Sequence, residues 1–165
     1  MQRFIFLSLG LLVVALSLSG TAADPNCRFD WFSYNGHCYK VFKQLRSWNN
    51  AEMFCRQQAE GGHLASIQSW GEAAYVASVV SRDVFLFNVW IGLSDPGKQH
   101  TWVWSNGSRF SYRSWKAGEP NNFLWREYCV ELWSLSGYLK WNDQSCSSLR
   151  YFICKFQPQG EGSTW

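Results

Sequence analysis

The chain has 165 residues, which suits one domain, and its formal net charge is only +3. A charge so small and so scattered gives no support for nucleic acid or a charged membrane surface as a partner. Eleven tryptophans, seven tyrosines and twelve phenylalanines indicate a dense aromatic core, a sugar-stacking surface, or both.

The N-terminal stretch has the order of a secretory signal peptide. Arg3 supplies a positive charge, Phe4–Leu18 is mostly apolar, and Gly20–Ala23 offers small residues for cleavage. An uncleaved anchor is the alternative, but the apolar run is shorter than a membrane span of ~20 residues. We therefore predict a signal peptide over residues 1–23 and a secreted, extracellular protein with no membrane insertion.

The remaining chain fits one compact domain over residues 24–156, followed by a flexible, polar tail over residues 157–165. Near its start, Asn35-Gly36 is a strong hairpin signal between two short predicted strands within residues 27–42.

Two helices are predicted next. Ser47 can cap a helix that runs through Cys55, and Ser69–Glu72 forms a capping box. The residues behind that box keep one apolar helical face: Ala73, Val76, Ala77 and Val80. After about residue 85 only short strands are predicted: Val89–Leu93, Trp102–Trp104, Cys129–Leu132, Tyr138–Trp141 and Tyr151–Cys154. The order of elements predicts an α+β fold with two early helices and a small antiparallel sheet.

A long loop, roughly residues 105–128, separates two of these strands, and loops of such length are usually functional or disordered. It contains Glu119-Pro120-Asn121 and Glu127, while Asn142-Asp143 follows the strand that we expect to end at Trp141. Either segment alone is typical of an ordinary turn. Their side chains all present oxygen, which Ca²⁺ prefers. The candidate metal ligands are Glu119, Asn121, Glu127, Asn142 and Asp143.

Six cysteines behind a signal peptide indicate disulfides formed in an oxidising compartment. No CxxC pair is present, which argues against zinc, and fifteen pairings are open. A bridge from Cys129 to Cys146 would clamp the two candidate ligand segments together, and this placement favours a metal site over two unrelated turns.

Several segments together resemble a C-type lectin domain over about Cys27 to Cys154, and in particular the snake-venom lectins. They are Trp90–Leu93, Glu119–Asn121, Trp141–Asp143, Ala51–Cys55, His63–Ser66 and the six-cysteine frame. The resemblance implies a fold with two helices, small antiparallel sheets, a long calcium-binding loop region and three disulfides. The implied pairs are Cys27–Cys38, Cys55–Cys154 and Cys129–Cys146.

The resemblance also implies a function. The five candidate ligands would hold one Ca²⁺, the peptide before Pro120 would be cis, and two neighbouring sugar hydroxyls would complete the metal's shell. The implied sugar-binding residues are Glu119, Pro120, Asn121, Glu127, Asn142 and Asp143. In this family Glu-Pro-Asn accompanies mannose-type sugars and Gln-Pro-Asp accompanies galactose. We therefore expect binding to mannose-class glycans of cell-surface glycoproteins or glycolipids, and a capacity to agglutinate cells.

Four positions refine this expectation. Arg109 stands where many venom lectins carry an interchain cysteine, so no interchain disulfide is expected. Tyr128 replaces an aspartate of a second family calcium site, which we expect to be absent or weak. Asn106 begins an N-glycosylation sequence, Asn-Gly-Ser. Trp125 lies between candidate ligands, and we expect it to pack the loop rather than to contact sugar.

Two other classes of function, a protein-binding venom protein and an enzyme, are alternatives to a sugar-binding protein. A venom C-type lectin-like protein would act on platelet receptors or clotting factors through protein contacts. Such relatives usually lose the calcium ligands and keep the interchain cysteine, and this chain has the opposite features. An enzyme is disfavoured because no nucleophile elbow, Ser-His-Asp set or zinc motif is evident.

Overall fold

The computed structural model of the chain describes residues 27–159. The predicted signal peptide and most of the predicted tail lie outside these residues. Within them, one eight-stranded sheet has the order β1-β2-β8-β4-β6-β7, with β3 paired to β8 and β5 paired to β4. The elements are β1 (Phe32–Tyr34), β2 (His37–Arg46), α1 (Trp48–Gln58), β3 (His63–Leu64), α2 (Trp70–Asp83), β4 (Val89–Ser94), β5 (Val103–Trp104), β6 (Cys129–Leu132), β7 (Trp141–Gln144) and β8 (Arg150–Phe156), with 3₁₀ turns η1 (Phe123–Trp125) and η2 (Ser134–Ser136).

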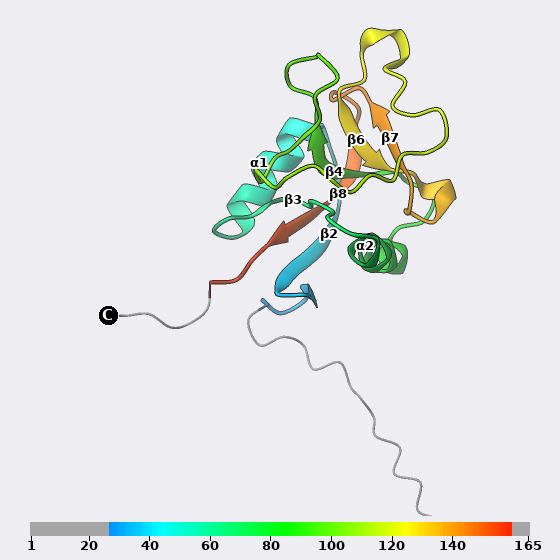
Figure 1. Cartoon of the computed structure of the whole chain (residues 1–165). Coiled ribbons are helices and arrows are strands. Elements are labelled where there is room, and N and C mark those ends of the chain that lie inside the picture. Colours follow the sequence, from blue (N-terminus) through cyan, green and yellow to red (C-terminus); the bar gives the residue numbers. More distant parts are fainter. Residues whose placement is uncertain (1–26, 160–165) are drawn as a thin grey trace, which may run out of the picture.

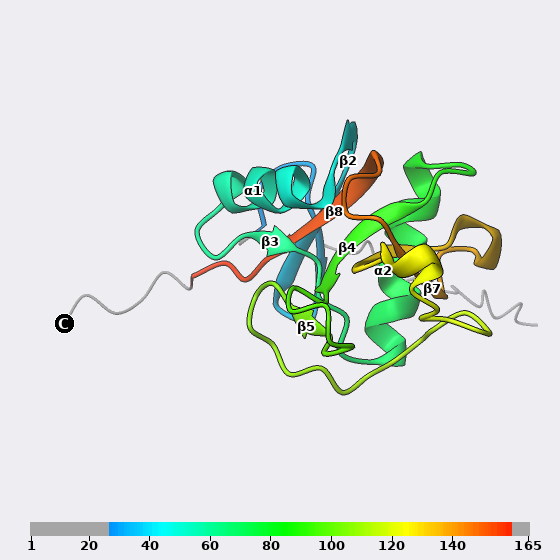
Figure 2. The ribbon, with the colours of Figure 1, turned by 90° about the horizontal axis from the view of Figure 1, so that it is seen from above.

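The long pair β2–β8 runs through the middle of the molecule, and α1 and α2 lie on opposite sides of it in Figure 1. The loop that carries η1, drawn in yellow, lies at the far end from both termini of the described chain. Seen from above in Figure 2, this loop lies over β7 and β4, away from α1. The candidate ligands are thus held at one end of the sheet by elements that are distant from each other in the sequence.

The local predictions for the first half of the chain are confirmed. Asn35 and Gly36 both have positive φ, at 46° and 75°, as the tight turn between β1 and β2 requires. The side chain of Ser47 accepts a hydrogen bond from the amide of Asn50 at the start of α1. At the start of α2 the Ser69 hydroxyl accepts from the amide of Glu72 at 3.1 Å.

The predicted strand Tyr138–Trp141 is wrong at all but its last residue, because β7 covers Trp141–Gln144. Gly137 and Tyr138 each have φ of 66°, a left-handed conformation that a strand does not adopt, and η2 precedes them. As a result, Asn142 and Asp143 lie inside a strand rather than after one. The expectation of an antiparallel sheet holds for every pair except β4 with β8, which is parallel.

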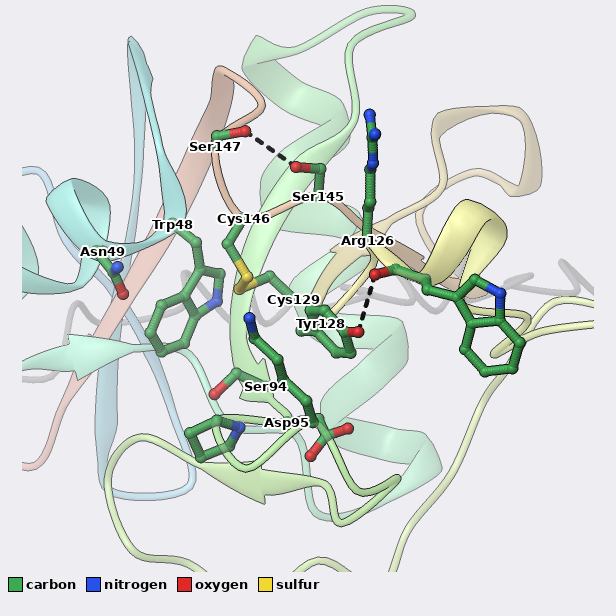
Figure 3. Close-up of a pocket in the computed structure, with 13 residues that line it drawn as sticks. Trp48, Asn49, Ser94, Asp95, Arg126, Tyr128, Cys129, Ser145, Cys146 and Ser147 are labelled. Carbon is green, nitrogen blue, oxygen red and sulfur yellow. Dashed lines mark hydrogen bonds between the residues drawn. A yellow bond between two sulfur atoms is a disulfide. The ribbon is translucent and has the colours of Figure 1, made fainter.

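All six cysteines are paired in the three disulfides that the family resemblance implied. Cys55–Cys154 joins α1 to β8, and Cys27–Cys38 closes the first hairpin. The third bridge, Cys129–Cys146, links the start of β6 to the turn after β7, as Figure 3 shows. The two segments that carry the candidate ligands are therefore covalently tied.

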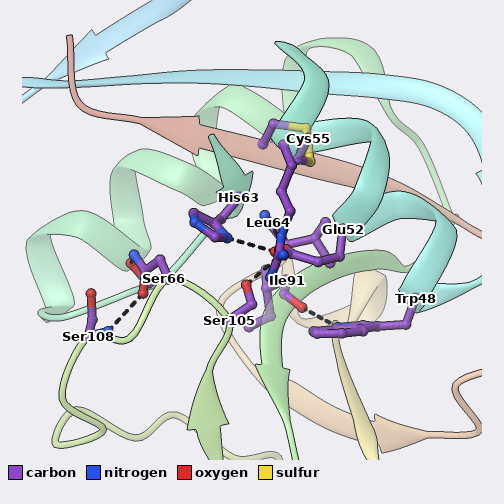
Figure 4. Close-up of polar contacts among 12 residues, drawn as sticks. Trp48, Glu52, Cys55, His63, Leu64, Ser66, Ile91, Ser105 and Ser108 are labelled. Carbon is purple, nitrogen blue, oxygen red and sulfur yellow. Dashed lines mark hydrogen bonds and ion pairs between the residues drawn. A yellow bond between two sulfur atoms is a disulfide. The ribbon is translucent and has the colours of Figure 1, made fainter. Parts of the chain in front are cut away.

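A buried carboxylate joins α1 to the sheet. Glu52 of α1 is only 5% exposed and accepts hydrogen bonds from four groups: Arg56 Nε, His63 Nδ1, the amide of Leu64 and the hydroxyl of Ser105 (Figure 4). Burial raises the pKa of Glu52, but these donors outweigh it and hold the pKa below its ordinary value of 4.5. The ionised form is thus the one that the fold stabilises.

We expect Glu52→Gln to lower the free energy of unfolding by about 2–4 kcal/mol, because the new amide nitrogen faces donors that it cannot accept from. The measurement is chemical denaturation with the disulfides intact, and the exposed Glu60→Gln is the matched control. Since the folded-state pKa of Glu52 is lowered, its contribution is complete above pH 4.5 and is lost as the pH falls through that lower pKa. A difference between the two proteins that persisted unchanged in strong acid would contradict this assignment.

Candidate functional site

The long loop is fastened to β7 through Trp141, which is fully buried. Three aromatic rings meet its edge or face at centroid distances of 5.7 Å, from Trp104, Tyr112 and Trp115. The backbone of Trp141 donates to the carbonyl of Ser114 and accepts from the amide of Lys116, both at 2.8 Å. The abundance of tryptophan therefore serves a packed aromatic core that places the loop beside Asn142 and Asp143.

Asp143 connects the loop to the sheet a second time. Its side chain is fully buried, and its two carboxylate oxygens accept from the amides of Asn121 and Asn122 at 3.1 and 2.7 Å. A carboxylate that accepts backbone amides makes strong, charge-assisted hydrogen bonds. The backbone that follows the cis peptide Glu119–Pro120 is thereby held against β7.

The loop ligands are joined to one another by hydrogen bonds. Asn121 Nδ2 donates to Glu119 Oε1 at 3.2 Å. The amide of Phe123 lies 2.9 Å from both Asn121 Oδ1 and Glu127 Oε2, so these two oxygens are close neighbours. The amide of Glu127 in turn donates to Asn122 Oδ1. The structure thus brings together four of the five predicted ligands: Glu119, Asn121, Glu127 and Asp143.

Asn142, the fifth predicted ligand, is held by a group that the sequence analysis missed. Its Nδ2 donates at 3.0 Å to Glu131, which is 1% exposed and also accepts from Arg150 Nε and Asn88 Nδ2. Asn142 and Asp143 are consecutive in β7, so their side chains leave the strand on opposite faces. The sequence signal for Glu131 was a lone carboxylate in an otherwise apolar strand, opposite Asn142 in the β6–β7 register.

The carboxylates of the site oppose each other's ionisation. Burial is the largest cause that raises the pKa of Glu119, to about 7; the neighbouring carboxylate of Asp143 raises it further, and the charge of Lys116 opposes the rise. Burial also raises the pKa of Glu127, where the charges of Asp143 and Glu131 add to it and the amide of Phe123 opposes it. Glu119 Oε2 is buried without a hydrogen-bond partner among the described residues. A buried, unpartnered acceptor among carboxylates is a place where a cation is favourable.

The donor chemistry of these residues suits Ca²⁺, which takes 6–8 oxygen ligands and tolerates flexible geometry. Within residues 27–159 the cluster contains carboxylate and amide oxygens and no thiolate or imidazole. The described side chains of His, Cys, Asp and Glu do not by themselves form a three-residue metal cluster. The carboxylate of Asp143 accepts hydrogen bonds from backbone amides of the loop, and two of the predicted ligands, Asn121 and Asn142, are asparagines.

Residues 44–156 match the family described as the lectin C-type domain. The chain belongs to the C-type lectin family. It is 64% identical to the C-type lectin lectoxin-Lio1 of Erythrolamprus poecilogyrus, over the whole length of both chains. It is 53% identical to the C-type lectin mannose-binding isoform of Oxyuranus scutellatus, over 94% of this chain and 98% of that one.

The fold agrees with this family assignment. The structure of human lithostathine superposes with a TM-score of 0.76 at 38% identity, over 79% of this chain and 99% of that one. Proteins of this family bind carbohydrates or other proteins and are not enzymes. The recognition of a C-type lectin domain in the sequence, of the venom-lectin type, is therefore confirmed.

Three of the refining positions can be placed. Tyr128 stands where the second family calcium site usually has an aspartate. The Lys98 ammonium lies 5.3 Å from the centroid of the Tyr128 ring, so this position has a lysine cation beside it. Asn106 is exposed, and its side chain donates to Ser66 Oγ and accepts from the amide of Ser108. Trp125 is 78% exposed, so the expectation that it packs the loop is wrong. Leu124 and Trp125 have φ of 55° and 58°, and this left-handed turn leaves both side chains in solvent.

We expect Asp143→Asn to lower the pKa of Glu119 below 7 in the presence of a chelator, because it removes the neighbouring negative charge. The pKa should stay above its ordinary value, since burial is the larger cause. Carbon-detected NMR titration of the carboxyl groups measures it. Asp95→Asn is the matched control, because Asp95 is also buried and accepts backbone amides but lies in another loop. An unchanged pKa in Asp143→Asn would show that the two carboxylates are not coupled.

Proposed function

We propose that this protein is a secreted, calcium-dependent lectin that binds mannose-class glycans on cell-surface glycoproteins or glycolipids. The observation that carries the proposal is the oxygen cluster at the end of β7, in which four predicted ligands share one set of hydrogen bonds and Glu119 retains a buried, unpartnered oxygen. A relative bearing the name mannose-binding isoform is 53% identical to this chain.

In this proposal Glu119, Asn121, Glu127, Asn142 and Asp143 hold one Ca²⁺. The ion, when bound, attracts two neighbouring hydroxyls of the sugar. Glu119 and Glu127 accept hydrogen bonds from those hydroxyls, while the amides of Asn121 and Asn142 donate to them. Asn121 Nδ2 and Asn142 Nδ2 each already donate one hydrogen, to Glu119 and to Glu131. An amide nitrogen carries two hydrogens, so each retains one for the sugar.

Secretion is supported by the three disulfides, which form and persist in oxidising compartments. Among the described residues no helix is long and apolar enough to cross a membrane. A venom protein that acts on platelet receptors or clotting factors through protein contacts is the alternative. It is disfavoured because all five ligand positions keep oxygen donors and Arg109 stands where an interchain cysteine would be.

We predict that binding to a mannose resin is lost in excess chelator. Because the pKa of Glu119 is raised to about 7 without metal, protons compete with calcium near neutral pH. The apparent calcium affinity should fall about tenfold between about pH 8 and about pH 6, as expected for one group titrating near the middle of that range. Isothermal titration calorimetry at several pH values measures this. Full mannose binding in chelator would refute the proposed function.

The second prediction concerns sugar specificity. The double change Glu119→Gln and Asn121→Asp preserves the loop charge, the oxygen ligands and Pro120, but reverses the positions of the donor and the acceptor. A mispaired buried polar group costs about 1–3 kcal/mol, or roughly five- to a hundredfold in affinity. We expect mannose binding to fall by that factor and galactose binding to appear, measured by competition with free monosaccharides at saturating calcium.

Calcium affinity of the same double variant is the internal control, since it should change little. If calcium still binds and mannose is still preferred with undiminished affinity, Glu119 and Asn121 do not read the sugar.

A further inference from the structure

A cavity of about 560 Å³ adjoins the candidate calcium site. Figure 3 shows Trp48 and Asn49 on one side of it and Arg126 and Tyr128 on the other, with the Cys129–Cys146 disulfide between them. Ligand-binding cavities typically measure ~300–1,000 Å³. Its volume therefore suits a sugar residue or a substituent of one.

The cavity carries unbalanced positive charge. Lys98 and Arg126 both line it, and neither forms an ion pair with an acidic side chain of the described residues. One lining residue, Asp95, is acidic, but it is 1% exposed and its two oxygens accept from the amides of residues 99, 100 and 101. Its charge is thus taken up by the loop that it organises.

The start of α1 adds to this potential. Trp48 and Asn49, the first two residues of the helix, line the cavity, and the first turn contains no acidic residue. A helix N-terminus carries a partial positive charge that favours anions. The cavity therefore receives positive potential from a lysine, an arginine and a helix dipole that come from three different segments of the chain.

The remaining lining groups suit a sugar. Ser145 and Ser147 present hydroxyls that lie 3.0 Å from each other, and Trp125 presents an aromatic ring that is 78% exposed. Exposed aromatic rings beside hydroxyl groups provide both stacking and hydrogen bonding for a carbohydrate. The cavity lies beside the loop that carries the candidate ligands, because Arg126 and Tyr128, which precede and follow Glu127, both line it, although Glu127 itself does not.

We propose that this cavity is a subsite for an acidic group, a sulfate ester or a carboxylate, on a glycan whose mannose-class residue binds at the neighbouring calcium site. The binding of a mannose-class residue at the calcium site is part of the proposed function, and this inference rests on it. The Arg126 guanidinium is suited to paired hydrogen bonds with two oxygens of either group, and Lys98 supplies a point charge.

The experiment compares three ligands at saturating calcium: a mannose disaccharide, the same disaccharide carrying one sulfate, and its sialylated counterpart. Affinities are measured by calorimetry. At low salt, at least one acidic ligand should bind about tenfold more tightly than the neutral parent, and the advantage should shrink at high salt. Whether the sulfated ligand, the sialylated ligand or both show this advantage identifies the source of the acidic group.

The variants Lys98→Gln and Arg126→Gln should reduce the ratio of acidic to neutral affinity toward one. Lys43→Gln and Arg113→Gln, which remove exposed cations outside the cavity, should leave the ratio as it is in the unmodified protein. A ratio of one in the unmodified protein, or a ratio that survives both cavity variants, overturns the proposal.

A second measurement separates this inference from the proposed function. Inorganic sulfate is titrated into the protein in chelator, and the side-chain Nε–H resonance of Arg126 is followed by NMR. A saturable shift that Lys98→Gln weakens supports the subsite even if no mannose binding is found. Absence of a shift rejects the subsite, as a disaccharide ratio of one does, and either result leaves calcium-dependent mannose binding intact.

Discussion

The carboxylate of Asp143 is the interaction on which the candidate site depends. It is fully buried in β7 and accepts hydrogen bonds from the backbone amides of Asn121 and Asn122. These bonds fix a long loop that has little regular structure of its own. Packing on Trp141 and the Cys129–Cys146 bridge bring the loop near, but hydrogen bonds to Asp143 set where its backbone lies. Burial is the largest cause of the raised pKa of Glu119, and the charge of Asp143 adds to it, so the carboxylate that orders the loop also makes a nearby cation more favourable.

Two carboxylates of this protein, Glu52 and Glu119, have pKa values shifted in opposite directions, which their surroundings explain. Glu52 is met by four donors, and its pKa is lowered, so its charge stabilises the contact of α1 with the sheet. Glu119 is met by another carboxylate and keeps an unpartnered oxygen, and its pKa is raised. An ionisable group that the fold leaves unsatisfied is a typical mark of a functional site. The contrast distinguishes the structural acid, Glu52, from Glu119, the acid that we propose to be functional.

The parts of the structure that the sequence predicted were mostly local. The Asn35-Gly36 turn and the caps at Ser47 and Ser69 follow from residues within one turn of each other, and the disulfide pairs followed from the family resemblance. The missed parts depend on contacts between distant segments. The link from Glu131 to Asn142 exists only because the β6–β7 register places the two residues opposite each other. The exposure of Trp125 depends on a left-handed turn at residues that are not glycine, so the sequence does not indicate it. The ligand set itself stays a prediction, although the structure brings four of its members together.

The central claim is that calcium and sugar share the residues at the end of β7. If two ligands bind one site together, each raises the affinity of the other by the same factor. The direct measurement is equilibrium dialysis of calcium against the protein, with and without saturating mannose. The account predicts one calcium per chain and tighter calcium binding when mannose is present. Calcium binding that is indifferent to mannose would contradict a shared site, even if both ligands bound to the protein.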